Sequence, residues 1–237
     1  MSDSGDAWPL SRPGRDELLD WIRSNVAHDT NILGRGYQGH VHLYQGHGRK
    51  LAIKSAEGRG PLAWLRRRML RHEYAVYRRL NSANYRHAPR CHGLLDGRHL
   101  VIEYVQSTPL RKMRPPDPAR FFDLLFEAIS GLHALGLAHS DLKRKDNILI
   151  VGHDTPCLID FGTAVIRKPG FAPLNHLLFR IARQYDYNAW LKHKYRRRRD
   201  TPAPEDLAYY HETLSERLAR ALKRPYMRLR RWLGRPR

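Results

Sequence analysis

Residues 139–162 carry most of the chain's candidate chemistry, in the order H-S-D-L-K-R-K-D-N-I-L-I-V-G-H-D-T-P-C-L-I-D-F-G. Asp141 and Asp160 flank an apolar hairpin over 148–159, whose turn contains Gly, Asp, Thr and Pro. Because a hairpin brings its two ends together, we expect both carboxylates and the amide of Asn147 to converge at one mouth. Three oxygen ligands around one point suit Mg²⁺, which binds carboxylates together with phosphate oxygens.

Lys143, two residues after Asp141, adds a cation where a transferring phosphoryl group would need one. The segment resembles the catalytic loop and metal-binding segment of the protein-kinase superfamily. The resemblance implies that Asp141 orients the acceptor hydroxyl or acts as general base, and that Asp160 binds the metal. Kinases usually have Asn five residues after the catalytic Asp, where this chain has Asp146. We favour Asn147 as the second metal ligand because it directly precedes the apolar strand, and Asp146 remains an alternative.

Gly34, Gly36 and Gly39, followed by Val41, fit the G-x-G-x-x-G spacing that lets a backbone approach phosphates closely. The same spacing opens dinucleotide-binding folds, and a structural hairpin with incidental glycines would also show it. A strand pattern and a turn at 46–48 follow, with no helix, which favours the nucleotide flap of a kinase.

The strand L-A-I-K that follows is expected to place Ala52 and Lys54 on the same side as the flap. The resemblance implies that Ala52 packs on adenine and that Lys54 holds the α- and β-phosphates. A helix is predicted over 61–80, and Glu73 falls on its apolar face, where a carboxylate needs a cation. Lys54 is the predicted partner, and a surface pair with an arginine of the same helix is the alternative.

The strand V-I-E-Y-V places Glu103 and Val105 at the predicted hinge, where the resemblance implies that backbone groups face adenine. A Pro-rich run then joins the lobes, and the apolar stretch 118–138 is predicted to form a helix that ends at Gly136. The expected fold is α+β, a two-lobed protein-kinase-like fold with a small β-rich N-lobe and a reduced, mostly helical C-lobe. Its predicted parts are an extension with a short helix (1–30), the N-lobe (31–105), the C-lobe (106–213) and a basic amphipathic tail (214–237).

The charge of the chain is extreme, because 43 Lys and Arg stand against 23 Asp and Glu, for a net charge of +20 in 237 residues. This excess favours a polyanionic partner such as nucleic acid, anionic lipid or a phosphorylated glycan, and solvated basic faces are the alternative. Two cysteines cannot form a disulfide framework and suit a reducing compartment. No secretory signal or long apolar run is found, so we expect a cytoplasmic protein without a transmembrane helix.

Two features depart from regulated protein kinases. Ser140 stands where those enzymes have Arg, and no Ala-Pro-Glu-like motif follows Asp160-Phe161-Gly162. With its short C-terminal part, the chain is similar over residues 30–195 to the small bacterial kinases of the lipopolysaccharide-core family. Those enzymes phosphorylate heptose or 3-deoxy-manno-octulosonic acid.

The tail 214–237 contains nine Lys or Arg and one acid, with leucines close to one helical face. This pattern fits a peripheral helix on an anionic membrane, and a disordered basic tail is the alternative. The prediction is therefore an ATP- and Mg²⁺-dependent kinase acting on a sugar hydroxyl of the lipopolysaccharide core, or a related lipid-linked glycan, at the cytoplasmic membrane face. Its expected partners are that anionic acceptor and the membrane surface, rather than nucleic acid or an obligate protein. An atypical Ser/Thr protein kinase and a nucleic-acid-binding or scaffolding pseudokinase are the alternatives.

Overall fold

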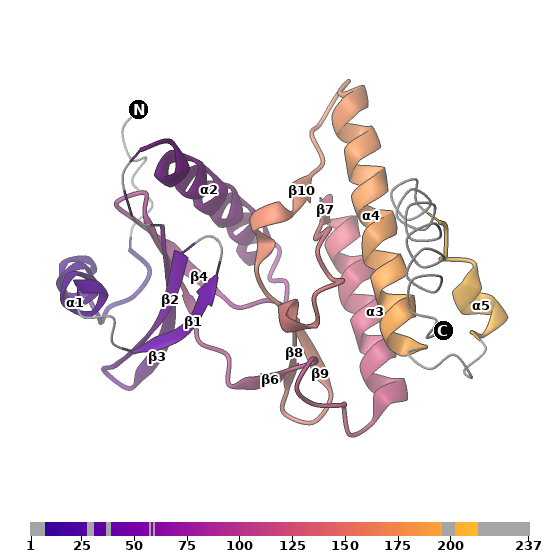
Figure 1. The fold of residues 1–237 in the computed structure, drawn as a ribbon, viewed down its shortest axis with the longest axis horizontal. Helices are drawn as coiled ribbons and strands as arrows, with labels where there is room; N and C mark the ends of the chain where they lie inside the picture. Colours follow the sequence, from indigo (N-terminus) through magenta and orange to yellow (C-terminus); the bar gives the residue numbers. More distant parts are fainter. Residues whose placement is uncertain are drawn as a thin grey trace, which may run out of the picture.

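The computed structural model describes residues 8–27, 31–36, 39–56, 58, 60–195 and 202–212. The predicted two-lobed α+β architecture is confirmed, with a β-rich first lobe beside a mostly helical second lobe (Figure 1). The predicted tail, residues 214–237, lies outside the described residues.

The first lobe is built on one antiparallel five-stranded sheet with the order β1-β2-β3-β5-β4. Its strands are β1 (Ile32–Gly36), β2 (Gly39–Gly46), β3 (Arg49–Ser55), β4 (Cys91–Leu95) and β5 (His99–Glu103). Helix α1 (Arg15–Ala27) covers one face, where Leu18 and Ile22 pack in a cluster with Leu51 and Ile53 of β3. Because side chains alternate along a strand, Ala52 and Lys54 point to the other face.

Helix α2 (Pro61–Ser82) belongs to this lobe and follows the predicted bounds closely. Pro61 is its first residue, a position that lacks an intrahelical partner for its N–H in any helix. Its buried face includes Leu70, Glu73, Val76 and Leu80. The apolar spacing also predicted Leu62 and Leu65 on the buried face, which is wrong, because both are exposed.

The second lobe centres on two neighbouring helices, α3 (Pro118–Ala134) and α4 (Pro173–Lys194) (Figure 1). Asp117 caps α3 by accepting a hydrogen bond from the Arg120 N–H at 3.1 Å. The sequence predicted that this helix ends at Gly136, and the structure ends it two residues earlier, at Ala134. Gly136 adopts a left-handed conformation (φ 69°) that ends the helix, and the next two residues form a strand instead.

Short strands and turns complete the second lobe. They are β6 (Ser107–Pro109), β7 (Leu137–Ala138), the 3₁₀ turn Lys145–Asn147, β8 (Ile148–Val151), β9 (Thr155–Leu158), the 3₁₀ turn Phe161–Thr163, β10 (Val165–Ile166) and the short helix α5 (Pro204–Leu207). One hydrophobic core runs through both lobes, from α2 through β8 and β9 to α3 and α4. Among the described helices, none is long and apolar enough to cross a membrane.

Candidate active site

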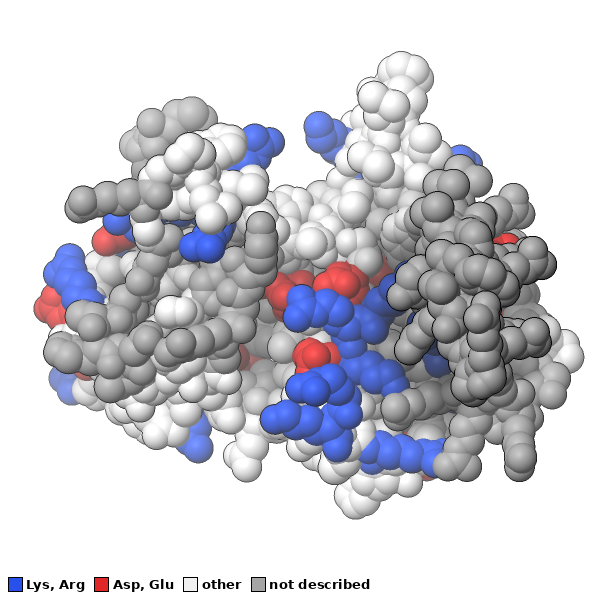
Figure 2. Space-filling model, in the orientation of Figure 1, with Lys and Arg blue, Asp and Glu red and all other residues white. Residues whose placement is uncertain are grey.

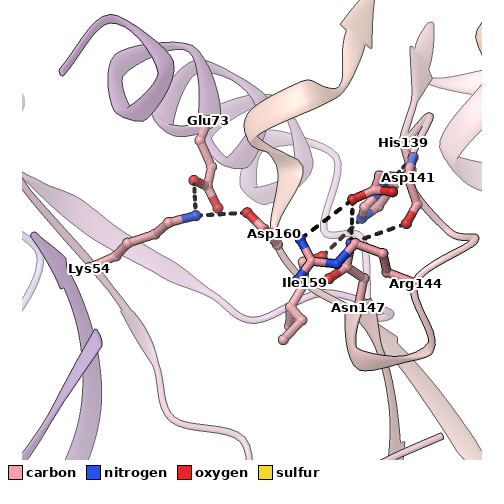
Figure 3. A network of polar contacts seen from close by, with 8 residues as sticks. All are labelled: Lys54, Glu73, His139, Asp141, Arg144, Asn147, Ile159 and Asp160. Atoms are coloured by element: carbon pink, nitrogen blue, oxygen red, sulfur yellow. Dashed lines mark hydrogen bonds and ion pairs between the residues drawn. The ribbon is translucent and has the colours of Figure 1, made fainter. Parts of the chain in front are cut away.

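The hairpin predicted at the centre of the sequence is formed by β8 and β9, with Ile148 opposite Leu158. Its open end is closed by the Ile159 N–H, which donates to the Asn147 carbonyl at 3.1 Å. This contact sets Asn147 beside the residue that precedes Asp160. The structure therefore gathers Asp141, Asn147 and Asp160 around one mouth, as Figure 3 shows.

Asn147 is buried and directs its amide toward the catalytic loop. Its NH₂ group donates to the backbone carbonyl of Asp141 at 3.1 Å and to the Asp141 carboxylate at 3.2 Å. Because the nitrogen makes both contacts, the amide oxygen is the atom that could bind a cation. The alternative ligand, Asp146, instead accepts a hydrogen bond from Arg111 at 2.6 Å on the protein surface. The geometry therefore favours Asn147.

The two predicted catalytic residues lie on the loop before the 3₁₀ turn. The Asp141 carboxylate is one-third exposed and has the Arg144 guanidinium 4.0 Å away, so it is open to an incoming hydroxyl. The Lys143 side chain, in the same loop, is exposed. This position permits the predicted role in neutralising charge, while no contact of Lys143 with the other site residues supports it.

Lys54 of β3 connects the two lobes through two carboxylates. Its ammonium lies 2.7 Å from an oxygen of Glu73 on α2 and 2.7 Å from an oxygen of Asp160 (Figure 3). The predicted Lys54–Glu73 pair is therefore formed, and Asp160 was not predicted as its third member. Although burial lowers the pKa of Lys54, the charges of Glu73 and then Asp160 outweigh it and raise that pKa overall.

The two carboxylates differ in their environments. Burial raises the pKa of Glu73, whose side chain is enclosed between α2 and the sheet, so Glu73 depends on Lys54 to stay ionised. Burial acts in the same direction on Asp160, but the Lys54 ammonium outweighs it and holds the pKa of Asp160 below its usual value. Asp160 also has a left-handed backbone (φ 66°), which is uncommon for a residue with a side chain and marks a constrained position.

Phe161 packs between α2 and the catalytic loop and is fully buried. Its ring makes edge contacts with Tyr77 of α2, at 5.2 Å between centroids, and lies 4.8 Å from the ring of His139. The His139 ring also hydrogen-bonds the Ile159 carbonyl at 2.9 Å. Through these contacts the helix that carries Glu73, the segment that carries Asp160 and the loop that carries Asp141 form one packed unit.

Asp186 of α4 is a site residue that the sequence reasoning missed. It is fully buried, and its carboxylate accepts hydrogen bonds from the backbone N–H groups of His139 and Ser140, both at 2.8 Å. It also lies 3.0 Å from the His133 ring. Ser140 has a left-handed backbone (φ 66°), so Asp186 fixes a strained turn immediately before Asp141. The available signal was an acid in an apolar helical stripe, the same signal that identified Glu73.

The glycine segment forms a strand pair, with no helix after it, which rules out the dinucleotide-binding alternative. Gly34 lies opposite Val41, and Gly36 lies opposite Gly39, across β1 and β2. Val41 in turn lies opposite Lys54 across β2 and β3. Residues opposite each other share a face of the sheet, so the glycine hairpin, Val41 and Lys54 line one surface.

Ala52 lies on that same surface, two residues before Lys54 along β3, and it is buried. At the predicted hinge, the Glu103 N–H donates to the Arg90 carbonyl, and the Glu103 carboxylate accepts from the Arg90 N–H. The Glu103 side chain therefore holds the start of β4. The Val105 N–H has no hydrogen-bond partner among the described residues, so it could serve an adenine base.

The donor set fits ATP with Mg²⁺. Glu73, Asp141 and Asp160 outnumber the two cations that contact them, Lys54 and Arg144, which leaves negative charge to balance. In the described part of the chain, no cluster of three or more His, Cys, Asp or Glu could hold a metal by itself. Mg²⁺ matches this arrangement because it takes few protein ligands and completes its shell with phosphate oxygens and water.

Comparisons with known proteins agree with this geometry. A family model described as the protein kinase domain matches residues 27–194. CBL-interacting protein kinase 4 from Oryza sativa subsp. japonica is 33% identical over 152 residues, which cover 57% of this chain and 32% of that protein. The chain therefore matches about a third of the length of this curated relative.

Proposed function

We propose that this chain, which belongs to the protein kinase domain family, phosphorylates a sugar hydroxyl of the lipopolysaccharide core or of a related lipid-linked glycan. The family match supports the predicted kinase, a phosphotransferase with an alcohol group as acceptor. The acceptor, the membrane and the cytoplasmic location are parts of the proposal.

Each residue of the site would have a separate role in phosphoryl transfer. ATP would supply the phosphoryl group, and Mg²⁺ would neutralise its charge. Lys54, held by Glu73, would bind phosphate oxygens, while Asp160 and Asn147 would hold the metal. Asp141, itself fixed by the Asn147 amide, would accept the hydrogen bond of the acceptor hydroxyl and aim it. Positioning and electrostatics suffice for this transfer, so no covalent intermediate on the protein is required.

A cationic rim beside Asp141 is the observation that carries the choice of an anionic acceptor. The rim comprises Arg111, Lys112, Arg114, Lys143, Arg144 and Lys145. Its two halves are joined because β6 pairs with β8, the Leu110 N–H donates to the Ile148 carbonyl, and Arg111 pairs with Asp146. Figure 2 shows Lys and Arg grouped around acidic residues at the centre of the molecule. Such a rim would attract phosphate or carboxylate groups on the acceptor.

The connection after Asp160 supports a small acceptor. Only residues 164–172 lie between the 3₁₀ turn Phe161–Thr163 and the start of α4, and two of them form β10. This connection pairs with β7 through Val165 and Ala138, so it lies against the lobe. It leaves little chain with which to hold an extended peptide.

A Ser/Thr protein kinase is the second candidate. It is favoured by the name of the rice relative and by the description of the family model. Because both candidates use the same nucleotide site, only the acceptor separates them.

An acceptor panel tests the proposal. We would compare γ-phosphate transfer from Mg-ATP to a delipidated, phosphate-bearing core oligosaccharide, to the same glycan after dephosphorylation, and to a Ser/Thr-rich protein. We expect transfer to the anionic glycan above all. Transfer to the protein with none to either glycan would favour the second candidate.

The rim can be tested by itself with Lys112→Gln/Arg114→Gln, which leaves the Arg111–Asp146 pair in place. We expect the KM for the anionic glycan to rise about fivefold to tenfold, since exposed charge pairs each contribute up to about 1 kcal/mol. The KM for ATP should not change. Arg23→Gln/Arg98→Gln removes two exposed charges elsewhere and serves as the matched control.

A further inference from the structure

Large apolar side chains are exposed at the amino-terminal ends of α2 and α4. Single exposed apolar residues are ordinary on a protein surface, but a cluster of them marks an interaction site. Phe171 is 97% exposed and Leu174 is 77% exposed. We name the full set the apolar edge, and its members are Leu62, Trp64, Leu65, Phe171, Leu174, Leu177 and Leu178.

The α4 part of the apolar edge projects from the molecule. The buried side of α4 carries Phe179, Ala182 and Asp186, whereas Leu174 and Leu178 lie one turn apart on its exposed side. In Figure 1 the first turns of α4 extend beyond the rest of the lobe, and the amino-terminal end of α2 lies lower, at the top of the first lobe. Both ends lie on the upper side of the molecule in this view.

This projecting end is held firmly. Asn175 accepts a hydrogen bond from the Lys168 N–H at 2.7 Å and donates to the Ile166 carbonyl at 3.0 Å. The His176 ring contacts the Lys168 carbonyl at 2.9 Å. These contacts tie the first turn of α4 to β10, so Phe171 and Leu174 are presented by a fixed turn.

Cations flank the apolar edge and acids are missing from it. Neither residues 60–71 nor residues 167–183 contain Asp or Glu. The first stretch contains four arginines, of which Arg68 lies over the Trp64 ring at 5.5 Å. The second contains Arg167, Lys168, Arg180 and Arg183. In Figure 2 the projection at the upper right carries no charge at its tip and has basic residues around its base.

We propose that the apolar edge docks on an anionic phospholipid bilayer. Trp64 and Phe171 would enter the boundary between headgroups and acyl chains, while the flanking Lys and Arg side chains reach the lipid phosphates. The inference deepens the proposed function, because a protein docked in this way works where a lipid-linked acceptor is found. The chain that follows Asp160 leads directly into the docked turn, so the site would lie close to the membrane.

Vesicle binding by the full chain tests the docking. Sedimentation with phosphatidylcholine vesicles containing 30% phosphatidylglycerol would be compared for the wild type, Phe171→Ser/Leu174→Ser and Leu207→Ser. Leu207 is an exposed leucine of α5 outside the apolar edge and provides the control. We expect the partition coefficient of the double variant to fall about tenfold, from the apolar area that no longer leaves water. The control should stay within about twofold of the wild type, because it removes no contact with the bilayer.

The contribution of the flanking charges is tested with Arg180→Gln/Arg183→Gln. We expect the vesicle partition coefficient to fall about fivefold for each charge removed. Binding of the wild type to vesicles of phosphatidylcholine alone should be weaker throughout. Unchanged binding of Phe171→Ser/Leu174→Ser would overturn the proposal and place the lipid contact elsewhere in the chain. A wild type that is dimeric in sedimentation equilibrium and becomes monomeric in that variant would also overturn it, because a second copy would then be the occupant.

The soluble acceptor separates this proposal from the proposed function. Phe171→Ser/Leu174→Ser should phosphorylate the delipidated glycan at the wild-type rate, which also shows that the variant is folded. If no glycan is phosphorylated while vesicle binding follows the predicted pattern, the proposed function fails and the docking surface stands. If the glycan is phosphorylated while the variants bind vesicles as strongly as the wild type does, the docking surface is wrong and the proposed function stands.

Discussion

Asp160 occupies its place because of Lys54 as much as because of its own backbone. The Lys54 ammonium contacts one carboxylate oxygen of Asp160 at 2.7 Å and holds the pKa of this residue below its usual value. A carboxylate that stays ionised in a half-buried site is suited to bind a divalent cation. Asp146, by contrast, forms an ion pair with Arg111 at the protein surface.

Asp160→Ala should therefore abolish the gain in nucleotide affinity that Mg²⁺ provides. Asp146→Ala, as the matched control, should retain it. Titration of an ATP analogue by calorimetry with and without Mg²⁺ measures both variants. Loss of the Mg²⁺ effect in Asp146→Ala, with retention in Asp160→Ala, would move the metal site to the neighbouring residue.

Which single residues could be found from the sequence depends on how local their signal is. Glu73 was identified because a carboxylate interrupts an apolar stripe, and Lys54 supplied the cation at a distance of 19 residues. Asp186 gives the same local signal between Phe179 and Trp190. Its partners are backbone N–H groups 46 and 47 residues away. Because every residue except proline has such a group, the sequence does not indicate which backbone donors Asp186 contacts.

At the scale of elements, α2 and β3 are joined by the charged pair Lys54–Glu73. The Glu73 side chain is 2% exposed, so water cannot solvate its carboxylate when Lys54 is removed. The aromatic contact of Tyr77 with Phe161 fixes α2 from the other side. The position of α2 therefore determines whether the Lys54–Glu73 pair forms and where the segment that carries Asp160 lies.

Lys54→Met should lower the free energy of unfolding by about 3–5 kcal/mol, the usual result of leaving one member of a buried ion pair alone. Lys54→Met/Glu73→Leu should recover part of that loss, because the unpaired charge is removed as well. Urea denaturation at pH 7 measures both. An unchanged stability in Lys54→Met would show that Glu73 does not depend on this lysine.

Elements with a local pattern were predicted well, and their ends less so. The hairpin β8–β9 and helix α2 follow from apolar spacing and from Gly or Pro at their ends. Gly136 indicated the end of α3 to within two residues, while the pairing of β7 with β10 is a long-range interaction that local spacing does not predict. The aromatic and basic stretch from residue 176 allowed a nucleic acid strand or sugars as ligands, but it also predicted Trp190 as a core residue, and this prediction is confirmed in α4.

For the whole molecule, the order of motifs along the chain was enough to predict two lobes with a nucleotide site between them. The order of motifs could not predict which side chains lie together on the surface of the folded protein. The cationic rim and the apolar edge combine residues from segments far apart in the sequence, and charge counts alone left nucleic acid, lipid and glycan open. The fold reduces this choice by placing one cationic group beside Asp141 and another beside exposed apolar residues.

Asp141, aimed by Asn147, would orient an acceptor hydroxyl toward the nucleotide held by Lys54. The most direct measurement is γ-phosphate transfer from Mg-ATP to the delipidated core oligosaccharide by the wild type and by Asp141→Asn, with the affinity of each protein for the nucleotide. We expect turnover to fall about 10²- to 10⁴-fold in the variant while nucleotide affinity is preserved. Turnover at the wild-type rate in Asp141→Asn would contradict the account.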